Sequence, residues 1–171
     1  MRVALIGFMC SGKTTVGRIL ARQAEVPFTD LDRCIEERIG PITPYFAAHG
    51  EEAFRAVEHA VLGEVLARDG ALVLATGGGT PLHADNLERL QGWGEVVLLK
   101  PSFEVLLHRI ERTGGDRPQL FGLKGKALHE RVRDLWNGRE RVYDRADRAV
   151  DADDAPDRVA ERILDELGQL R

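Results

Sequence analysis

The stretch MRVALIGFMCSGKTT, residues 1–15, decides how the chain begins to fold. An apolar run at Val3–Ile6 predicts a short buried strand. Residues Gly7–Thr14 then match the pattern G-x-x-x-x-G-K-[ST], a loop that holds phosphate groups between a strand and a helix. Apolar spacing over residues 13–24 predicts the helix that this pattern requires. The stretch therefore predicts an α/β domain that binds a nucleoside triphosphate.

Each fixed position of this pattern has its own task at the phosphates. Glycines let the backbone curl until successive N–H groups point at phosphate oxygens, and the following helix adds its positive end. Lys13 can reach the β- and γ-phosphates, and the Thr14 hydroxyl can bind Mg²⁺. The candidate nucleotide-binding residues of the loop and first turn are Cys10, Ser11, Gly12, Lys13, Thr14 and Thr15.

Strands and helices alternate through the rest of the 171 residues. Further strands are predicted at Pro27–Thr29, Ala71–Ala75, Glu95–Leu99 and Ala149–Asp151. Helices are predicted over 51–68, 102–111, about 126–145 and from Pro156 onward. This alternation is typical of one domain with a parallel sheet covered on both faces. Residues 112–126 are rich in glycine and too long for an ordinary connection, so we predict a mobile loop there.

Composition excludes several functional classes. The net charge is −4, so no basic field is present to attract nucleic acid or an anionic membrane. No apolar stretch approaches the length of a membrane span, and the first apolar run leads into the glycine loop rather than a signal-peptide cleavage site. The base-reading motif N-K-x-D of GTPases is missing. We expect a cytoplasmic monomer with reduced cysteines that binds neither nucleic acid nor membranes.

Several later residues allow two interpretations each. Asp30 and Asp32 end the second strand, where they could cap a following helix or serve Mg²⁺ and a substrate hydroxyl. The segment around Arg55, taken alone, favours a surface ion pair of this arginine with Glu51 or Glu58 over a role in substrate binding. The run Gly77–Gly79 is either a loose turn or a place where a ligand approaches the backbone.

Six motifs taken together resemble the shikimate kinase family over nearly the whole chain. They are GxxxxGKT, D-x-D, F-R-x-x-E, G-G-G, R-P in a glycine-rich loop and R-x-x-x-Y, in the family's order. The resemblance implies the P-loop nucleoside monophosphate kinase-like fold, with a five-stranded parallel sheet in the order 2-3-1-4-5. It implies a substrate-binding region at about 31–60 and a flexible lid at about 112–126. The implied reaction is the phosphorylation of the shikimate 3-hydroxyl by ATP, on the route to chorismate.

The resemblance also implies roles around the nucleotide. Lys13 and Thr14 would hold the phosphates and one Mg²⁺ ion, which Asp30 would support through a water molecule. Arg117 would reach the phosphates from the lid as a catalytic residue. Two residues would enclose the adenine ring, Arg112 and Pro156.

The resemblance also implies roles around the acceptor. Asp32 would bind the shikimate hydroxyls and act as the catalytic base. Arg55 and Arg139 would bind the shikimate carboxylate, and Gly77–Gly79 would line the same pocket. A planar guanidinium suits this task because it can form two charge-assisted hydrogen bonds with one carboxylate. Pro44 stands where a helix former is usual, so we expect the helix of the substrate region to begin after it.

Three other functions remain open from the sequence. A kinase of another small hydroxy acid, such as gluconate, would also need arginines for a carboxylate. A nucleoside monophosphate kinase is a weaker candidate, because two arginines and two aspartates suit a hydroxylated acid better than a nucleobase. A nucleotide sensor without catalysis would not need Asp32 beside Lys13. The D-x-D, F-R and G-G-G set favours shikimate.

Overall fold

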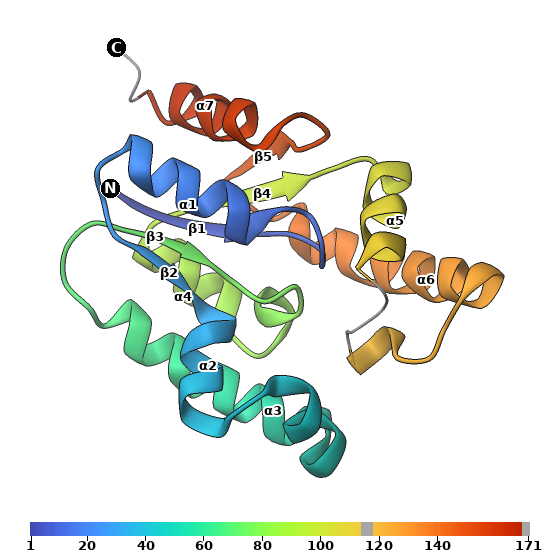
Figure 1. Cartoon of the computed structure of the whole chain (residues 1–171). Coiled ribbons are helices and arrows are strands. Elements are labelled where there is room, and N and C mark those ends of the chain that lie inside the picture. Colours follow the sequence, from blue (N-terminus) through green and yellow to red (C-terminus); the bar gives the residue numbers. More distant parts are fainter. Residues whose placement is uncertain (114–117, 169–171) are drawn as a thin grey trace.

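The computed structural model describes residues 1–113 and 118–168 and places a parallel sheet between two layers of helices (Figure 1). The five strands follow the order β2-β3-β1-β4-β5, and every neighbouring pair is parallel. Their bounds are β1 (Arg2–Ile6), β2 (Phe28–Asp30), β3 (Leu72–Ala75), β4 (Glu95–Lys100) and β5 (Arg148–Asp151). The predicted strands and their order are confirmed, with each strand end within one residue of its expected position.

Helices connect the strands and cover both faces of the sheet. They are α1 (Lys13–Gln23), α2 (Leu31–Ile39), α3 (Ile42–Leu66), α4 (Asn86–Trp93), α5 (Phe103–Arg112), α6 (Gly125–Tyr143) and α7 (Pro156–Glu166), with short 3-10 helices η1 (Thr80–Leu82) and η2 (Pro118–Leu120). The sequence did not predict α4, because its eight residues are too few to show a clear helical period. Among the described residues, no helix is both long and apolar enough to cross a membrane.

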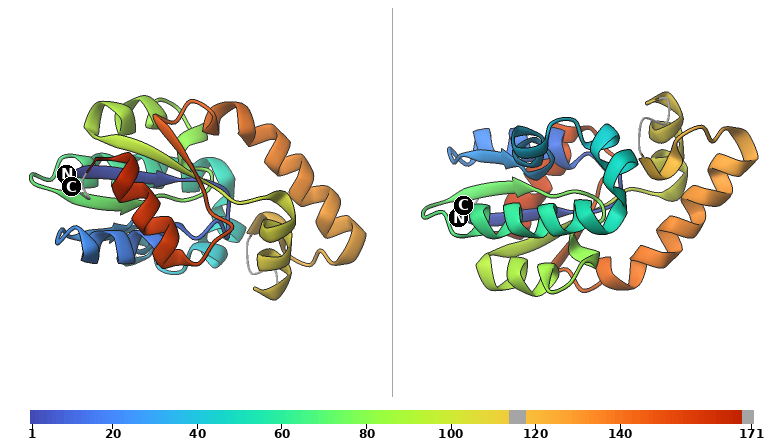
Figure 2. Two further views of the ribbon diagram at one scale, coloured as in Figure 1. Left: turned by 90° about the horizontal axis from the view of Figure 1, so that it is seen from above. Right: turned by 90° about the horizontal axis from the view of Figure 1, so that it is seen from below.

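Alternating side chains of the central strands β1, β3 and β4 enter two separate cores. Val3 and Leu5 of β1 pack in the core beneath α1 and α7. Ala4 and Ile6 point to the opposite face and pack with residues of α2 to α6. Figure 2, seen from above, separates α1 and α7 on one side of the sheet from α4 on the other. Because both faces are buried, the central strands are almost entirely apolar.

The substrate region corrects one expectation. The helix α3 begins at Ile42, before Pro44 rather than after it. A proline in the first turn is compatible with a helix because the first N–H groups have no carbonyl partner within it. Gly50, with φ 82° and ψ 174°, then kinks α3 and brings Phe46 against Phe54, with 5.7 Å between ring centroids.

The segment 112–126 also differs from the continuous loop that was predicted. Arg112 ends α5, η2 follows the undescribed residues, and Gly125 begins α6. Leu120 in η2 is fully buried, so apolar packing holds this turn against the domain. Arg117 lies outside the described residues. The mobility of the segment stays a prediction.

Candidate active site

The phosphate-binding loop has a backbone that only glycine accommodates at two of its positions. Gly7 and Gly12 have φ values of 143° and 102°. A Cβ atom on Gly7 would also lie 2.7 Å from the carbonyl oxygen of Leu99. Lys13 folds back over the loop, and its Nζ donates hydrogen bonds of 2.8 Å to the carbonyl oxygens of Gly7 and Phe8. The loop thus holds Lys13 in place, and this lysine lines the cavity described next.

A cavity of about 680 Å³ lies between this loop and the segment that joins β5 to α7. We call it the nucleotide cavity. All the described residues that the sequence assigned to the nucleotide line it: Cys10, Ser11, Gly12, Lys13, Thr14, Thr15, Arg112 and Pro156. The fold therefore brings together residues that are up to 146 positions apart in the sequence.

Asp30 caps α2, as its position allowed, and also contacts the first turn of α1. Its Oδ1 accepts a hydrogen bond of 3.1 Å from the backbone N–H of Asp32 and so caps α2. Its Oδ2 accepts a hydrogen bond of 2.7 Å from the Thr14 hydroxyl. The carboxylate at the end of β2 therefore lies directly beside the first turn of α1.

A second cavity of about 460 Å³ adjoins the first, and we call it the acceptor cavity. All the residues assigned to the acceptor line it: Asp32, Arg55, Gly77, Gly78, Gly79 and Arg139. Asp32, Gly77 and Gly78 line the nucleotide cavity as well. Ligands in the two cavities would meet at these three residues.

The three glycines are required by close packing and do not form a loose turn. A Cβ atom on Gly77 would lie 2.9 Å from the Thr80 hydroxyl, and one on Gly78 would lie 3.1 Å from the backbone nitrogen of Met9. On Gly79 it would lie 2.7 Å from the guanidinium carbon of Arg55. A side chain on Gly78 would press on the backbone of the phosphate-binding loop, and one on Gly79 would displace the guanidinium group of Arg55.

Arg55 forms the ion pairs that its helical spacing predicted, but it does not lie on an open surface. Its side chain is 13% exposed; Nη1 lies 2.5 Å from Oε2 of Glu58, and Nη2 lies 3.5 Å from Glu51. Glu58 is 1% exposed and also accepts a hydrogen bond of 2.7 Å from Thr80. The buried carboxylate of Glu58 therefore orients Arg55 and compensates its charge.

Arg139 has a different electrostatic environment. It is 6% exposed, and its Nη2 donates a hydrogen bond of 2.5 Å to Oε1 of Gln119 in η2. Its guanidinium carbon also lies 5.0 Å from the ring centroid of Phe8. Within the described residues this partner is an uncharged amide, so the charge of Arg139 is less compensated there than that of Arg55. Gln119 was not predicted, because a single glutamine in a glycine-rich segment carries no motif.

Tyr143 links α6 to the glycine run. Its hydroxyl donates a hydrogen bond of 2.5 Å to the carbonyl oxygen of Gly78. Burial raises the pKa of Tyr143 to about 12, although the nearby cations of Arg139 and Arg55 act in the opposite direction. The phenol therefore stays protonated and keeps donating across the physiological pH range.

A pH-dependent contribution to stability follows from this tyrosine. In the unfolded chain, Tyr143 ionises near its usual pKa of about 10. Between about pH 10 and pH 12 the unfolded state thus holds fewer protons, and stability falls by about 1.4 kcal/mol per pH unit from this group. We expect wild type to be more stable than Tyr143→Phe below pH 10, with the difference shrinking up to pH 12. Urea unfolding from pH 8 to 12 measures it; a constant difference would contradict the prediction.

The fold and the two adjoining cavities define a P-loop kinase. In such a protein the phosphate-binding loop lies beside a second site for the acceptor, which here is the arginine-lined acceptor cavity. The family model for shikimate kinase matches residues 9–168. The chain is similar to the shikimate kinase of Parabacteroides distasonis, 40% identical over 89% of this chain and 88% of the relative. The chain belongs to the shikimate kinase family. It is a kinase that phosphorylates shikimate with ATP, in the biosynthesis of aromatic amino acids.

Solved structures agree with this assignment. The shikimate kinase from Acinetobacter baumannii in complex with shikimate has a TM-score of 0.89 and 36% identity, covering 99% of this chain and 95% of the other. A gluconokinase from Sinorhizobium meliloti has a TM-score of 0.67 at 20% identity, covering 99% and 92%. The second likeness shows the shared fold alone. The family match therefore favours shikimate over the gluconate alternative.

Proposed function

We propose that Asp32 is the catalytic base that activates the 3-hydroxyl of shikimate for attack on the γ-phosphate of ATP. The observation that carries this proposal is the place of Asp32, which lines both cavities where they meet. The attacking oxygen forms a bond to γ-phosphorus, its proton passes to the Asp32 carboxylate, and the bond to the β-phosphate oxygen breaks to release ADP. A positioned base of this kind removes the proton as the new bond forms.

On the nucleotide side, the backbone N–H groups of the loop and the Lys13 ammonium would neutralise the phosphates. Lys13 would exchange its bonds to the loop carbonyls for bonds to phosphate oxygens. Arg112 and Pro156 would enclose adenine, since both line the nucleotide cavity. Arg117 would bind the phosphates from the lid, and this role depends on the family resemblance alone.

On the acceptor side, Arg55 and Arg139 would bind the shikimate carboxylate, with Gly77–Gly79 and residues 31–60 forming the walls. Both guanidinium groups line one cavity and carry fixed partners that limit their motion. A carboxylate would replace the neutral Gln119 oxygen on Arg139, and charge-assisted bonds are roughly twice as strong as neutral ones. The site thus suits a small acid.

The divalent metal that kinases of this kind use is proposed to be one Mg²⁺ ion. The Thr14 hydroxyl and the Asp30 carboxylate lie 2.7 Å apart beside the loop, and such hard oxygen donors fit Mg²⁺. Thr14 would bind the ion directly and Asp30 through water. When bound, Mg²⁺ neutralises charge on the β- and γ-phosphate oxygens.

We also propose that the chain acts as one domain, a monomeric cytoplasmic enzyme that binds neither nucleic acid nor membranes. The single sheet with its two helical layers supports the one-domain organisation. The net charge of −4 opposes association with polyanions.

A coupled assay of ADP release tests the proposed reaction. We expect ADP release only with ATP and shikimate together, and at least about a hundredfold lower kcat/KM with gluconate, because gluconate presents its hydroxyls on a flexible chain. The product should carry phosphate on the 3-oxygen, which two-dimensional ¹H–³¹P NMR identifies.

Two controls accompany this assay. EDTA should stop turnover, and added Mg²⁺ should restore it. Lys13→Met, which keeps the length of the side chain and removes its charge, should abolish shikimate-dependent turnover. Equal turnover without an acceptor, or equal rates with gluconate, would contradict the proposal.

A further inference from the structure

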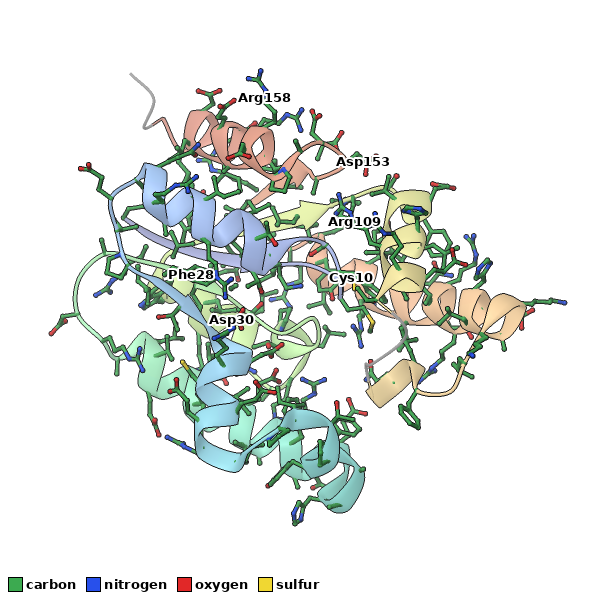
Figure 3. All side chains as sticks on the ribbon, in the orientation of Figure 1. Cys10, Phe28, Asp30, Arg109, Asp153 and Arg158 are labelled. Carbon is green, nitrogen blue, oxygen red and sulfur yellow. The ribbon has the colours of Figure 1, made fainter. Side chains whose placement is uncertain are left out.

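Arg109 connects the two backbone segments that form opposite walls of the nucleotide cavity. It lies on α5, where it is partly buried, and it lines this cavity. Its Nη1 donates a hydrogen bond of 3.3 Å to the carbonyl oxygen of Ser11, and its Nη2 donates one of 2.9 Å to that of Ala152. Figure 3 shows Arg109 between Cys10 of the phosphate-binding loop and Asp153.

The two bonded segments belong to different ends of the cavity. Ser11 is part of the phosphate-binding loop, whereas Ala152 follows β5 and leads to Pro156. The same α5 helix also holds the second segment at its first turn, where the N–H of Ser102 donates a hydrogen bond of 2.6 Å to Oδ1 of Asp153. The helix α5 is therefore the common support of both walls.

An arginine is well suited to this connection. Its guanidinium group carries five N–H donors in one rigid plane, so two terminal nitrogens can bind two carbonyls in fixed relative directions. A lysine ammonium is a compact charge on a flexible stem and does not fix two separate segments in the same way. Ser11 and Ala152 are 141 positions apart in the sequence, and Arg109 bonds the carbonyl oxygens of both directly.

We propose that Arg109 is a positioning residue for ATP, which sets the separation between the phosphate-binding end and the adenine-binding end of the cavity. This inference rests on the proposed nucleotide site, in which Pro156 faces adenine. ATP contacts both ends at once, whereas inorganic tripolyphosphate occupies only the phosphate end. Arg109 should therefore matter for ATP much more than for tripolyphosphate or shikimate.

Two variants test this role. Arg109→Met removes both hydrogen bonds and keeps an unbranched side chain, and we expect it to raise the KM for ATP about tenfold, as the loss of hydrogen bonds from a charged donor predicts. The KM for shikimate and the inhibition constant of tripolyphosphate should change by less than about twofold, the range of an ordinary surface substitution. Arg109→Lys, which retains the charge, should raise the KM for ATP by an intermediate factor.

Arg158→Met is the matched control. Arg158 lies on α7, 71% exposed and paired with Glu161, and Figure 3 shows it away from Cys10 and Arg109. All constants of this control should match wild type, and thermal unfolding of each variant should confirm folding. The wild-type enzyme in the same assay reports separately on the proposed function, through its shikimate-dependent ADP release.

Three results would overturn the inference. An equal loss of affinity for tripolyphosphate and ATP would make Arg109 a direct phosphate ligand. Equal increases in the KM for ATP and for shikimate, with a lowered melting temperature, would show a general structural role. An unchanged KM for ATP in both variants would show that the two bonds do not position the nucleotide.

Discussion

Asp32→Asn is expected to lower kcat by about 10²- to 10⁴-fold, the contribution of a positioned general base. The amide keeps the size of the side chain but cannot accept the proton of the attacking hydroxyl. Asp32 lines both cavities, and asparagine has nearly the same size as aspartate, so the substitution changes the charge of this side chain and hardly its volume. Steady-state kinetics with saturating ATP and shikimate measures the loss.

The affinity for ATP separates this role from a role at the nucleotide. In Asp32→Asn, the dissociation constant of ATP should stay within about threefold of wild type, since the proposed phosphate contacts come from the loop and Lys13. Asp30→Asn offers the contrast, because Asp30 accepts the Thr14 hydrogen bond and should affect binding of the metal–nucleotide complex. A parallel loss of kcat and ATP affinity in Asp32→Asn would instead place this carboxylate on the nucleotide.

The second large effect is expected at the two arginines of the acceptor cavity. Arg139→Ala and Arg55→Ala should each lower kcat/KM for shikimate by about ten- to a hundredfold, since a hydrogen bond to a charged group contributes roughly 1.5–3 kcal/mol. Arg139 should show the larger loss in binding, because Glu58 already compensates the charge of Arg55 whereas Arg139 faces the neutral Gln119. The KM for ATP should change little.

An uncharged substrate analogue sharpens this experiment. Wild type should discriminate strongly between shikimate and its methyl ester, and Arg139→Ala should lose most of that discrimination. Arg141→Ala is the control, since Arg141 is exposed on the same helix. If Arg139→Ala kept near-normal turnover at low shikimate concentrations, the proposed carboxylate site would be wrong.

Arg55 needs one additional control because of its buried partner. Removal of Arg55 alone leaves the Glu58 carboxylate, 1% exposed, without its ion pair, and an unpaired buried charge is costly. The double variant Arg55→Met with Glu58→Gln removes both charges. Comparison of melting temperatures for the single and double variants separates lost substrate binding from lost stability.

The sequence by itself determined the features that depend on neighbouring residues. The loop at Gly7–Thr14 is readable because phosphate binding needs glycines, lysine and a hydroxyl at consecutive places along one turn. The strands and longer helices are readable because burial on one or both faces imposes a periodic apolar pattern. The sequence did not predict the short α4, because two helical turns show little periodicity. It also did not predict that α3 begins before Pro44, because a proline is tolerated in the first turn of a helix.

Only the tertiary structure decided how the site is assembled. Parallel strands end at one edge of the sheet, so β1, β2 and β3 deliver the phosphate-binding loop, Asp32 and the glycine run to one place. The partners Glu58 for Arg55, Gln119 for Arg139 and two carbonyls for Arg109 come from packing between elements distant in the chain. Such contacts leave no period in the sequence, because they depend on where separate helices dock.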